Sequence, residues 1–80
     1  MPRYFFDLYD HQTIIDDHGI ELSDIGAASA EAVRLLADIA KEFMPKGATE
    51  QEFAVHVRLE SGAIVLKATG VFKVELVAPE

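Results

Sequence analysis

The sequence predicts an α+β fold, a two-layer sandwich in which one long helix packs on a mainly antiparallel sheet of four or five strands. The stretch from Ser23 to Met44 has a hydrophobic period of 3.6 residues and carries its charges on the opposite face, which is typical of a helix lying on a core. Before and after it, apolar residues alternate with period two, as they do in strands. The order strand–strand–helix–strand–strand around one helix indicates a single domain spanning residues 1–80.

Two strands are expected before the helix. Aromatic residues alternate from Arg3 to Asp10, and both faces of this strand carry them, which favours a place inside the sheet. The β-branched run from Thr13 to Asp16 is expected to pair back on the first strand. Asp17-His18-Gly19 then forms a turn, in which the glycine is free to adopt a positive φ.

The helix should bury one face and expose the other. Its apolar face is predicted to comprise Ile25, Ala28, Ser29, Ala32, Val33, Leu35, Leu36, Ile39, Ala40 and Phe43. On the exposed face, Arg34 follows Glu31 by three residues and precedes Asp38 by four, a spacing that favours ion pairs. A row of small residues (Gly26, Ala30, Val33 and Ala37) lies at the edge of the apolar face. It either packs on the sheet or faces solvent, or it forms a second contact surface for another copy of the chain.

The ends of the helix carry their own signals. Ser23 or Asp24 can accept hydrogen bonds from the first free N–H groups. Pro45 disfavours helical geometry at the residue before it, and Gly47 can adopt the left-handed conformation that ends a helix. After this end, one extra helical turn is expected over Thr49 to Glu52.

The second half of the chain predicts a hairpin. The alternation from Phe53 to Glu60 is the clearest strand in the sequence, and Ser61-Gly62 is expected to make a two-residue turn. Ala63 to Thr69 forms the return strand. Gly70 predicts a bulge or bend, after which Val71 to Val77 continues the sheet or forms a fifth strand.

The alternation along each predicted strand indicates which side chains face the helix and which face away from it. The residues expected to face the helix are Tyr4, Phe6, Leu8, Phe53, Val55, Val57 and Leu59. Those expected on the opposite, uncovered face are Phe5, Tyr9, His56, Arg58, Val65 and Lys67. An antiparallel sheet tolerates water on one side, so this outer face is either partly exposed or an interface. In the second case Phe5, Tyr9, His56 and Arg58 are the predicted interface residues.

Composition limits the classes of partner. The net charge of −7 opposes binding to nucleic acid or anionic lipid and favours a basic protein partner. The chain has no cysteine and no apolar run of about 20 residues that could span a bilayer. Its start lacks the features of a signal peptide, so a cytoplasmic location is expected. A chain of 80 residues buries a small core, which favours a homodimer.

One polar cluster invites a metal-binding hypothesis. It comprises Asp10, His11, Asp16, Asp17 and His18, whose side chains are of types that ligate Zn²⁺ or other divalent ions. Their spacing matches no metal motif, and turns use the same residues, so the turn interpretation is preferred. No nucleophile, phosphate-loop or dinucleotide motif is present. We therefore expect no enzymatic activity, no catalytic residues and no cofactor.

The segments MPRYFFDLYD, DDHGIELSDIGAASAEAVRLLADIAKEF and FAVHVRLESGAIVLK together cover nearly the whole chain. They resemble a family of small bacterial domains of unknown function, found in rhizobia and their relatives, whose members begin MPRYFF. The resemblance implies no activity and carries over no functional residue. A looser, fold-level likeness is to small antitoxins, which pair a short sheet with an Ala- and Glu-rich helix.

Three functional hypotheses remain. The preferred one is a protein-interaction or self-association module without chemistry of its own. The alternative is an antitoxin-like or regulatory partner of a basic protein. A divalent-metal-binding protein is the third.

Overall fold

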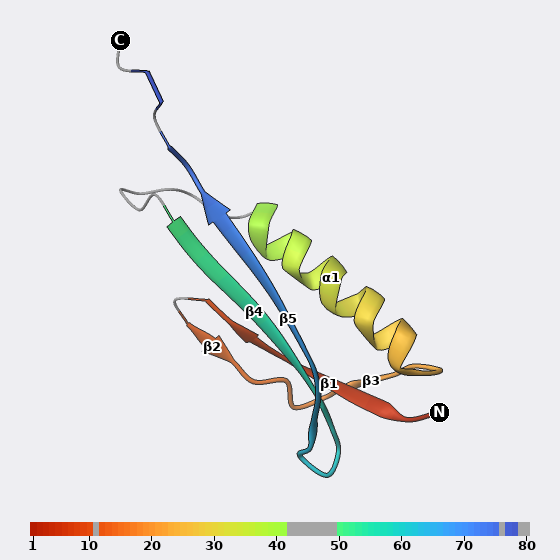
Figure 1. Cartoon of the computed structure of the whole chain (residues 1–80). Coiled ribbons are helices and arrows are strands. Elements are labelled where there is room, and N and C mark those ends of the chain that lie inside the picture. The colour runs from red at the N-terminus through yellow and green to blue at the C-terminus, as the bar shows by residue number, and fades with distance from the viewer. Residues whose placement is uncertain (11, 42–49, 76, 79–80) are drawn as a thin grey trace.

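A computed structural model describes residues 1–10, 12–41, 50–75 and 77–78 of the chain (Figure 1). One helix, α1 (Ile25–Lys41), covers one face of an antiparallel sheet. The strands are β1 (Arg3–Tyr9), β2 (Thr13–Ile14), β3 (Ile20–Glu21), β4 (Glu50–Leu59) and β5 (Ile64–Lys73). The predicted α+β sandwich is confirmed.

The strands lie in the order β2-β1-β4-β5, and β3 also pairs with β1. One edge of β1 pairs with β4, with Phe6 opposite Val57 and Asp7 opposite His56. Its other edge is shared by two short strands, because β2 pairs near Leu8 and β3 pairs near Tyr4. The aromatic strand therefore lies inside the sheet, as predicted, and β5 forms the far edge of the described sheet.

The core lies between the sheet and α1. Its buried members are Tyr4, Phe6, Ala28, Ala32, Val55 and Val57. Side chains packed against them are Leu8, Leu22, Leu35, Leu36, Ile39, Leu59, Leu66 and Ala68. Phe53 is also buried, and its ring meets that of Phe72 edge-on with centroids 6.5 Å apart. The predicted inward face of β1 and β4 is confirmed, whereas Ile25 and Val33 of the predicted helix face are exposed.

The start and the charged face of the helix follow the prediction. The Asp24 carboxylate accepts a hydrogen bond from the Ala27 N–H at 2.9 Å, which caps the helix. Arg34 pairs with both Glu31 and Asp38 on the exposed face. The predicted helix end, with Phe43, Met44, Pro45 and Gly47, lies outside the described residues, as does Thr49.

Several local predictions are wrong. Glu50 to Glu52 belong to β4 instead of a helical turn. The hairpin turn is longer than the predicted two residues, because four residues, Glu60 to Ala63, lie between β4 and β5. The Gly62 N–H donates to the Leu59 oxygen, and Gly62 has a φ of 96°, a geometry that glycine adopts without a steric penalty. Of the two alternatives for the residues from Val71 onward, continuation of the sheet is confirmed as far as Lys73, whereas the fifth strand is Ile20–Glu21, before the helix.

The bulge expected at Gly70 is also absent, because β5 runs through this residue. Gly70 lies opposite Phe53, and a Cβ added at Gly70 would meet no atom within 4 Å, so no close approach requires a glycine here. The shift in register falls instead between Val57 and Arg58. Val65 is therefore the extra residue of β5.

The row of small residues on α1 faces solvent. Gly26, Ala30, Val33 and Ala37 are all exposed. In the part of the chain that the structure describes, no helix is both long and apolar enough to cross a membrane.

Candidate functional site

The segment between β2 and β3, residues 15–19, lies where a continuous strand would pair with the middle of β1. The carboxylate of Asp16 accepts the hydrogen bond that the backbone of such a strand would accept from β1. Its Oδ2 accepts a hydrogen bond from the Phe6 N–H at 3.1 Å, so the β1 donor is satisfied. Its Oδ1 accepts from the N–H groups of His18 at 3.0 Å and Gly19 at 3.1 Å. One carboxylate thus closes the turn and attaches it to the sheet.

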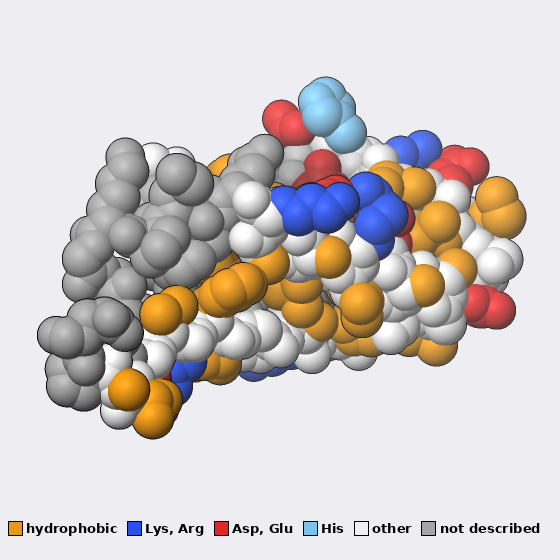
Figure 2. All heavy atoms as spheres, turned by 90° about the horizontal axis from the view of Figure 1, so that it is seen from above, with side chains coloured by type: hydrophobic (Ala, Val, Ile, Leu, Met, Phe, Trp, Pro, Cys, Tyr) orange, Lys and Arg blue, Asp and Glu red, His pale blue; other side chains and the backbone are white. Residues whose placement is uncertain are grey.

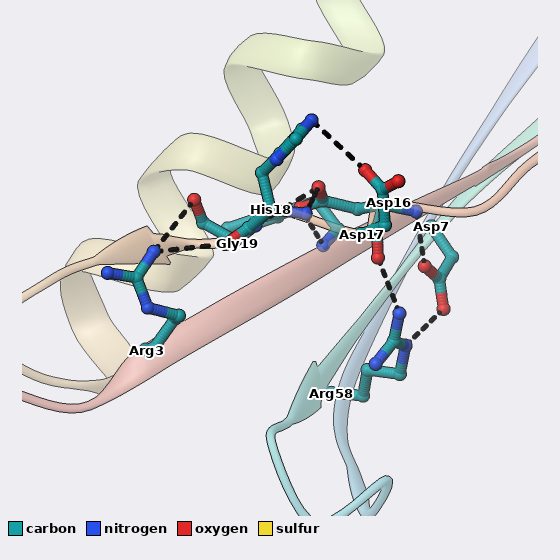
Figure 3. Close-up of polar contacts among 8 residues, drawn as sticks. Arg3, Asp7, Asp16, Asp17, His18, Gly19 and Arg58 are labelled. Carbon is teal, nitrogen blue, oxygen red and sulfur yellow. Dashed lines mark hydrogen bonds and ion pairs between the residues drawn. The ribbon is translucent and has the colours of Figure 1, made fainter.

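Asp7, Asp16 and Arg58 form a connected set, which we call the Asp7–Arg58 network (Figure 3). Asp7 is only 5% exposed, and its Oδ2 lies 2.9 Å from Nε of Arg58. Its Oδ1 accepts from the Asp16 N–H at 3.0 Å. Nη2 of Arg58 donates to the Asp16 carbonyl oxygen at 2.6 Å. The network therefore joins β1, β4 and the 15–19 segment.

The same arrangement buries Phe5. The Arg58 guanidinium lies 4.7 Å from the centroid of the Phe5 ring, a cation–π distance. Gly19, at a φ of 74°, lies so close that an added Cβ would be 3.0 Å from the ring and 2.8 Å from Cγ of Arg3. Only glycine fits this approach without strain. Phe5 is therefore 9% exposed, contrary to the exposure expected for it on the outer face.

The electrostatics of Asp16 reflect its hydrogen bonds. Burial raises the pKa of this carboxyl, but the N–H groups of His18, Gly19 and Phe6 outweigh burial, and the pKa lies below its ordinary value. The ionised form is the one that accepts all three bonds. Folding is therefore linked to ionisation of Asp16.

We predict that Asp16→Asn costs about 2 kcal/mol of unfolding free energy at pH 7. The substitution replaces one of the two acceptor oxygens with an NH₂ group, which cannot accept a hydrogen bond from the backbone N–H that faces it. Because the folded pKa is lowered, the contribution of Asp16 is present above the unfolded pKa of about 3.9 and is lost as pH falls through the folded value. Urea unfolding of both proteins between pH 7 and pH 2.5 should show the difference shrinking in acid.

The neighbouring Asp17→Asn variant is the matched control, since the Asp17 side chain is 84% exposed and its Oδ1 lies 3.2 Å from Nε2 of His18, which is also exposed. It should change stability by no more than about 0.5 kcal/mol. Equal losses for the two variants would contradict the role given to Asp16.

The polar cluster raised as a metal site is dispersed over turns. Asp10 Oδ1 accepts from the Gln12 N–H at 2.7 Å, Asp16 belongs to the network, and Asp17 and His18 point to solvent. His11 lies outside the described residues. Across residues 1–10, 12–41, 50–75 and 77–78, no three His, Cys, Asp or Glu side chains gather in a way that could hold a metal ion.

The four predicted interface residues have different surroundings. Tyr9 and His56 are partly exposed neighbours, with ring centroids 4.5 Å apart. Arg58 is committed to the network, and Phe5 lies beneath it. Their role as an interface stays a prediction.

A second exposed surface, which the sequence analysis did not predict, lies at β5, the last strand of the described sheet. Large hydrophobic side chains on or just after this strand remain at least 40% exposed, namely Ile64, Val65, Val71, Phe72 and Val74. The sequence contained a signal for it, because the last strand of a hairpin often forms the edge of a sheet. We call this surface the β5 edge.

The comparisons with known proteins include a match to a protein family. The family model described as "Domain of unknown function (DUF6894)" matches residues 3–71. No curated protein and no solved structure in the comparisons matches the chain. The expected bacterial origin and the shared MPRYFF start stay predictions. Since the match spans most of the chain, the protein belongs to the DUF6894 domain family.

Proposed function

We propose that this protein is a non-catalytic interaction module that works as a homodimer. The observation that carries the proposal is an imbalance of hydrophobic side chains. Among the described residues, eight hydrophobic side chains are buried, and twelve large ones remain at least 40% exposed. Figure 2 shows several groups of orange, hydrophobic side chains among white and charged atoms on the described part of the face seen from above. Extensive apolar exposure of this kind marks interaction surfaces.

The surface area supports the same proposal. The chain exposes 5661 Å². A compact monomer of 8.8 kDa exposes about 4,800 Å² by the scaling of surface with mass. The exposed residues 74–75 and 77–78, which follow β5 in the sequence, contribute to the excess. The excess, about 900 Å², is close to the roughly 800 Å² that each partner buries in a standard interface.

The polar groups support the non-catalytic part of the proposal. In the described part of the chain, every buried side-chain nitrogen or oxygen has a hydrogen-bond partner. The buried charges of Asp7 and Arg58 are used by each other and by backbone groups. An active site usually keeps a titratable group available for substrate, and the Asp7–Arg58 network is instead saturated.

We predict that light scattering coupled to gel filtration will give a mass near twice 8.8 kDa at about 100 μM, above the micromolar dissociation constants usual for modest interfaces. The mass should fall toward that of the monomer on dilution. A mass of 8.8 kDa that persists to millimolar concentration would contradict the homodimer.

A regulatory or antitoxin-like role with a basic protein is the second candidate. The net charge of −7 favours it, because opposite charge accelerates encounter and stabilises a complex. Its test is co-expression with a small basic protein encoded beside the gene. A complex that dissociates as salt rises supports this role, and independent migration of the two proteins at low salt argues against it.

A further inference from the structure

The two edges of the sheet differ in their capacity to accept another strand. At the β2/β3 edge, two strands of two residues each are separated by the 15–19 segment, which the Asp7–Arg58 network fixes in place. Short, interrupted edges resist further pairing. At the opposite edge, β5 is one strand of ten residues, irregular only near its start at Val65. Among the described residues, none forms a strand on its outer side. An edge strand of this kind offers backbone N–H and C=O groups for pairing with another strand.

The charge of β5 suits a second copy of the same chain. Between Ile64 and Lys73 the sequence has two lysines and no acidic residue, although the whole chain has a net charge of −7. Two acidic chains repel each other over most of their surfaces. Contact through β5 brings together two strands that contain no acidic residue, so the repulsion between acidic side chains is smaller there.

We propose that β5 pairs antiparallel with β5 of a second copy, which joins the two sheets into one. This inference rests on the proposed function and assigns the surface by which the dimer forms. Opposed residues of antiparallel strands share a face, so both helices cover the same side of the joined sheet. A second extended strand satisfies the edge backbone groups, which a helix or an irregular loop would leave unpaired.

Two criteria determine how β5 aligns with β5 of the second copy: the regular length of the strand and the positions of its lysines. Beyond the irregularity at Val65, the regular part of β5 runs from Leu66 to Lys73. A two-fold axis at Gly70 would place Lys67 opposite Lys73, and like charges directly opposite each other are unfavourable. An axis at Thr69 avoids this and keeps almost the full regular length. The opposed pairs are then Val65 with Lys73, Leu66 with Phe72, Lys67 with Val71, Ala68 with Gly70, and Thr69 with itself.

The register is tested by cross-linking, because the chain has no native cysteine. In Thr69→Cys the two new thiols face each other across the axis, and directly opposed Cβ atoms lie about 4.5–5.5 Å apart. Oxidation of the purified protein with diamide should convert most of it to a covalent dimer on non-reducing gels. A short bis-maleimide, which does not require disulfide geometry, should give the same product.

The matched control is Thr13→Cys, which places the same substitution at an exposed position on the opposite edge of the sheet. It should remain monomeric on the gel. Lys67→Cys and Val71→Cys should each cross-link poorly alone and efficiently when mixed, because the proposed register opposes them only across the interface.

The outcomes separate the two proposals. A protein that is dimeric by mass, yet cross-links no better through Thr69→Cys than through Thr13→Cys, overturns the β5 interface and leaves the homodimer standing. Efficient Thr69→Cys product without the mixed product overturns the register. A monomeric mass at high concentration overturns both the homodimer and its interface.

Discussion

Replacing Arg58 with methionine is expected to lower the unfolding free energy by about 3 kcal/mol, because it leaves the Asp7 carboxylate buried without its cation. The Asp7 side chain is 7% exposed and the Arg58 side chain 23% exposed, so water can compensate little of the lost contact. The variant also loses the hydrogen bond to the Asp16 oxygen and the cation above Phe5. For a domain whose total stability is about 4–12 kcal/mol, this is a large fraction.

Arg34→Met is the matched control for this prediction. Arg34 also pairs with two carboxylates, those of Glu31 and Asp38, but it does so on the exposed face of α1. Exposed pairs of this kind contribute about 0.3–0.5 kcal/mol each. Urea unfolding at one fixed protein concentration measures both variants, since dimerisation makes stability depend on concentration. Similar losses for Arg58→Met and Arg34→Met would contradict the importance of burial.

A second substitution isolates the charge. In Asp7→Asn combined with Arg58→Met, the asparagine Oδ1 can still accept from the Asp16 N–H, and no unpaired charge is left inside. The double variant is expected to recover at least half of the loss, since the cost of breaking a buried pair comes mainly from the charge left behind. A double variant less stable than Arg58→Met alone would show that the cost lies elsewhere, in lost packing over Phe5.

The features that the sequence predicted correctly are those encoded by local periodicity. The helix, its Asp24 cap and the pairs of Arg34 depend on residues within four positions of one another. The alternation of Phe53, Val55 and Val57 identifies the inward face of β4 without knowledge of its neighbours. Such signals require only the repeat of the element itself.

The Asp7–Arg58 network could not be predicted in the same way. Asp7 and Arg58 are separated by 51 positions, and their pairing depends on the register between β1 and β4. Asp16 was expected to end a strand or serve a turn, and the structure shows that its carboxylate also replaces a strand hydrogen bond on β1. Burial of Phe5 follows from these contacts, so its expected exposure was wrong for a tertiary reason.

The position of β5 shows a further limit of prediction from hydrophobic periodicity. Alternation predicts a strand but does not say whether one or both of its edges are paired. The expected interruption at Gly70 concealed that β5 is a single strand of ten residues. Only the strand order shows that this long strand ends the described sheet, and that the shorter β2 and β3 occupy the opposite edge.

Val71→Lys is expected to weaken the dimer by about 100-fold, which corresponds to roughly 2.7 kcal/mol. In the proposed register Val71 lies opposite Lys67 of the second copy, so the substitution creates two opposed lysine pairs and removes two apolar contacts from the interface. Opposed like charges cost up to about 1 kcal/mol each, and the lost burial of valine supplies the rest. Sedimentation at several protein concentrations measures the dissociation constant.

The charge-reversed variant distinguishes the interface from the fold. Within one chain Val71 lies opposite Glu52, so Val71→Lys should slightly stabilise the monomer and Val71→Glu should slightly destabilise it. Across the proposed interface the effects are reversed, because Val71→Glu faces lysine and should bind at least ten times more tightly than Val71→Lys. A variant whose monomer is more stable and whose dimer is weaker cannot be explained by damage to the fold. If both substitutions weaken the dimer equally, Lys67 does not lie opposite Val71, and an axis at Thr69 is wrong.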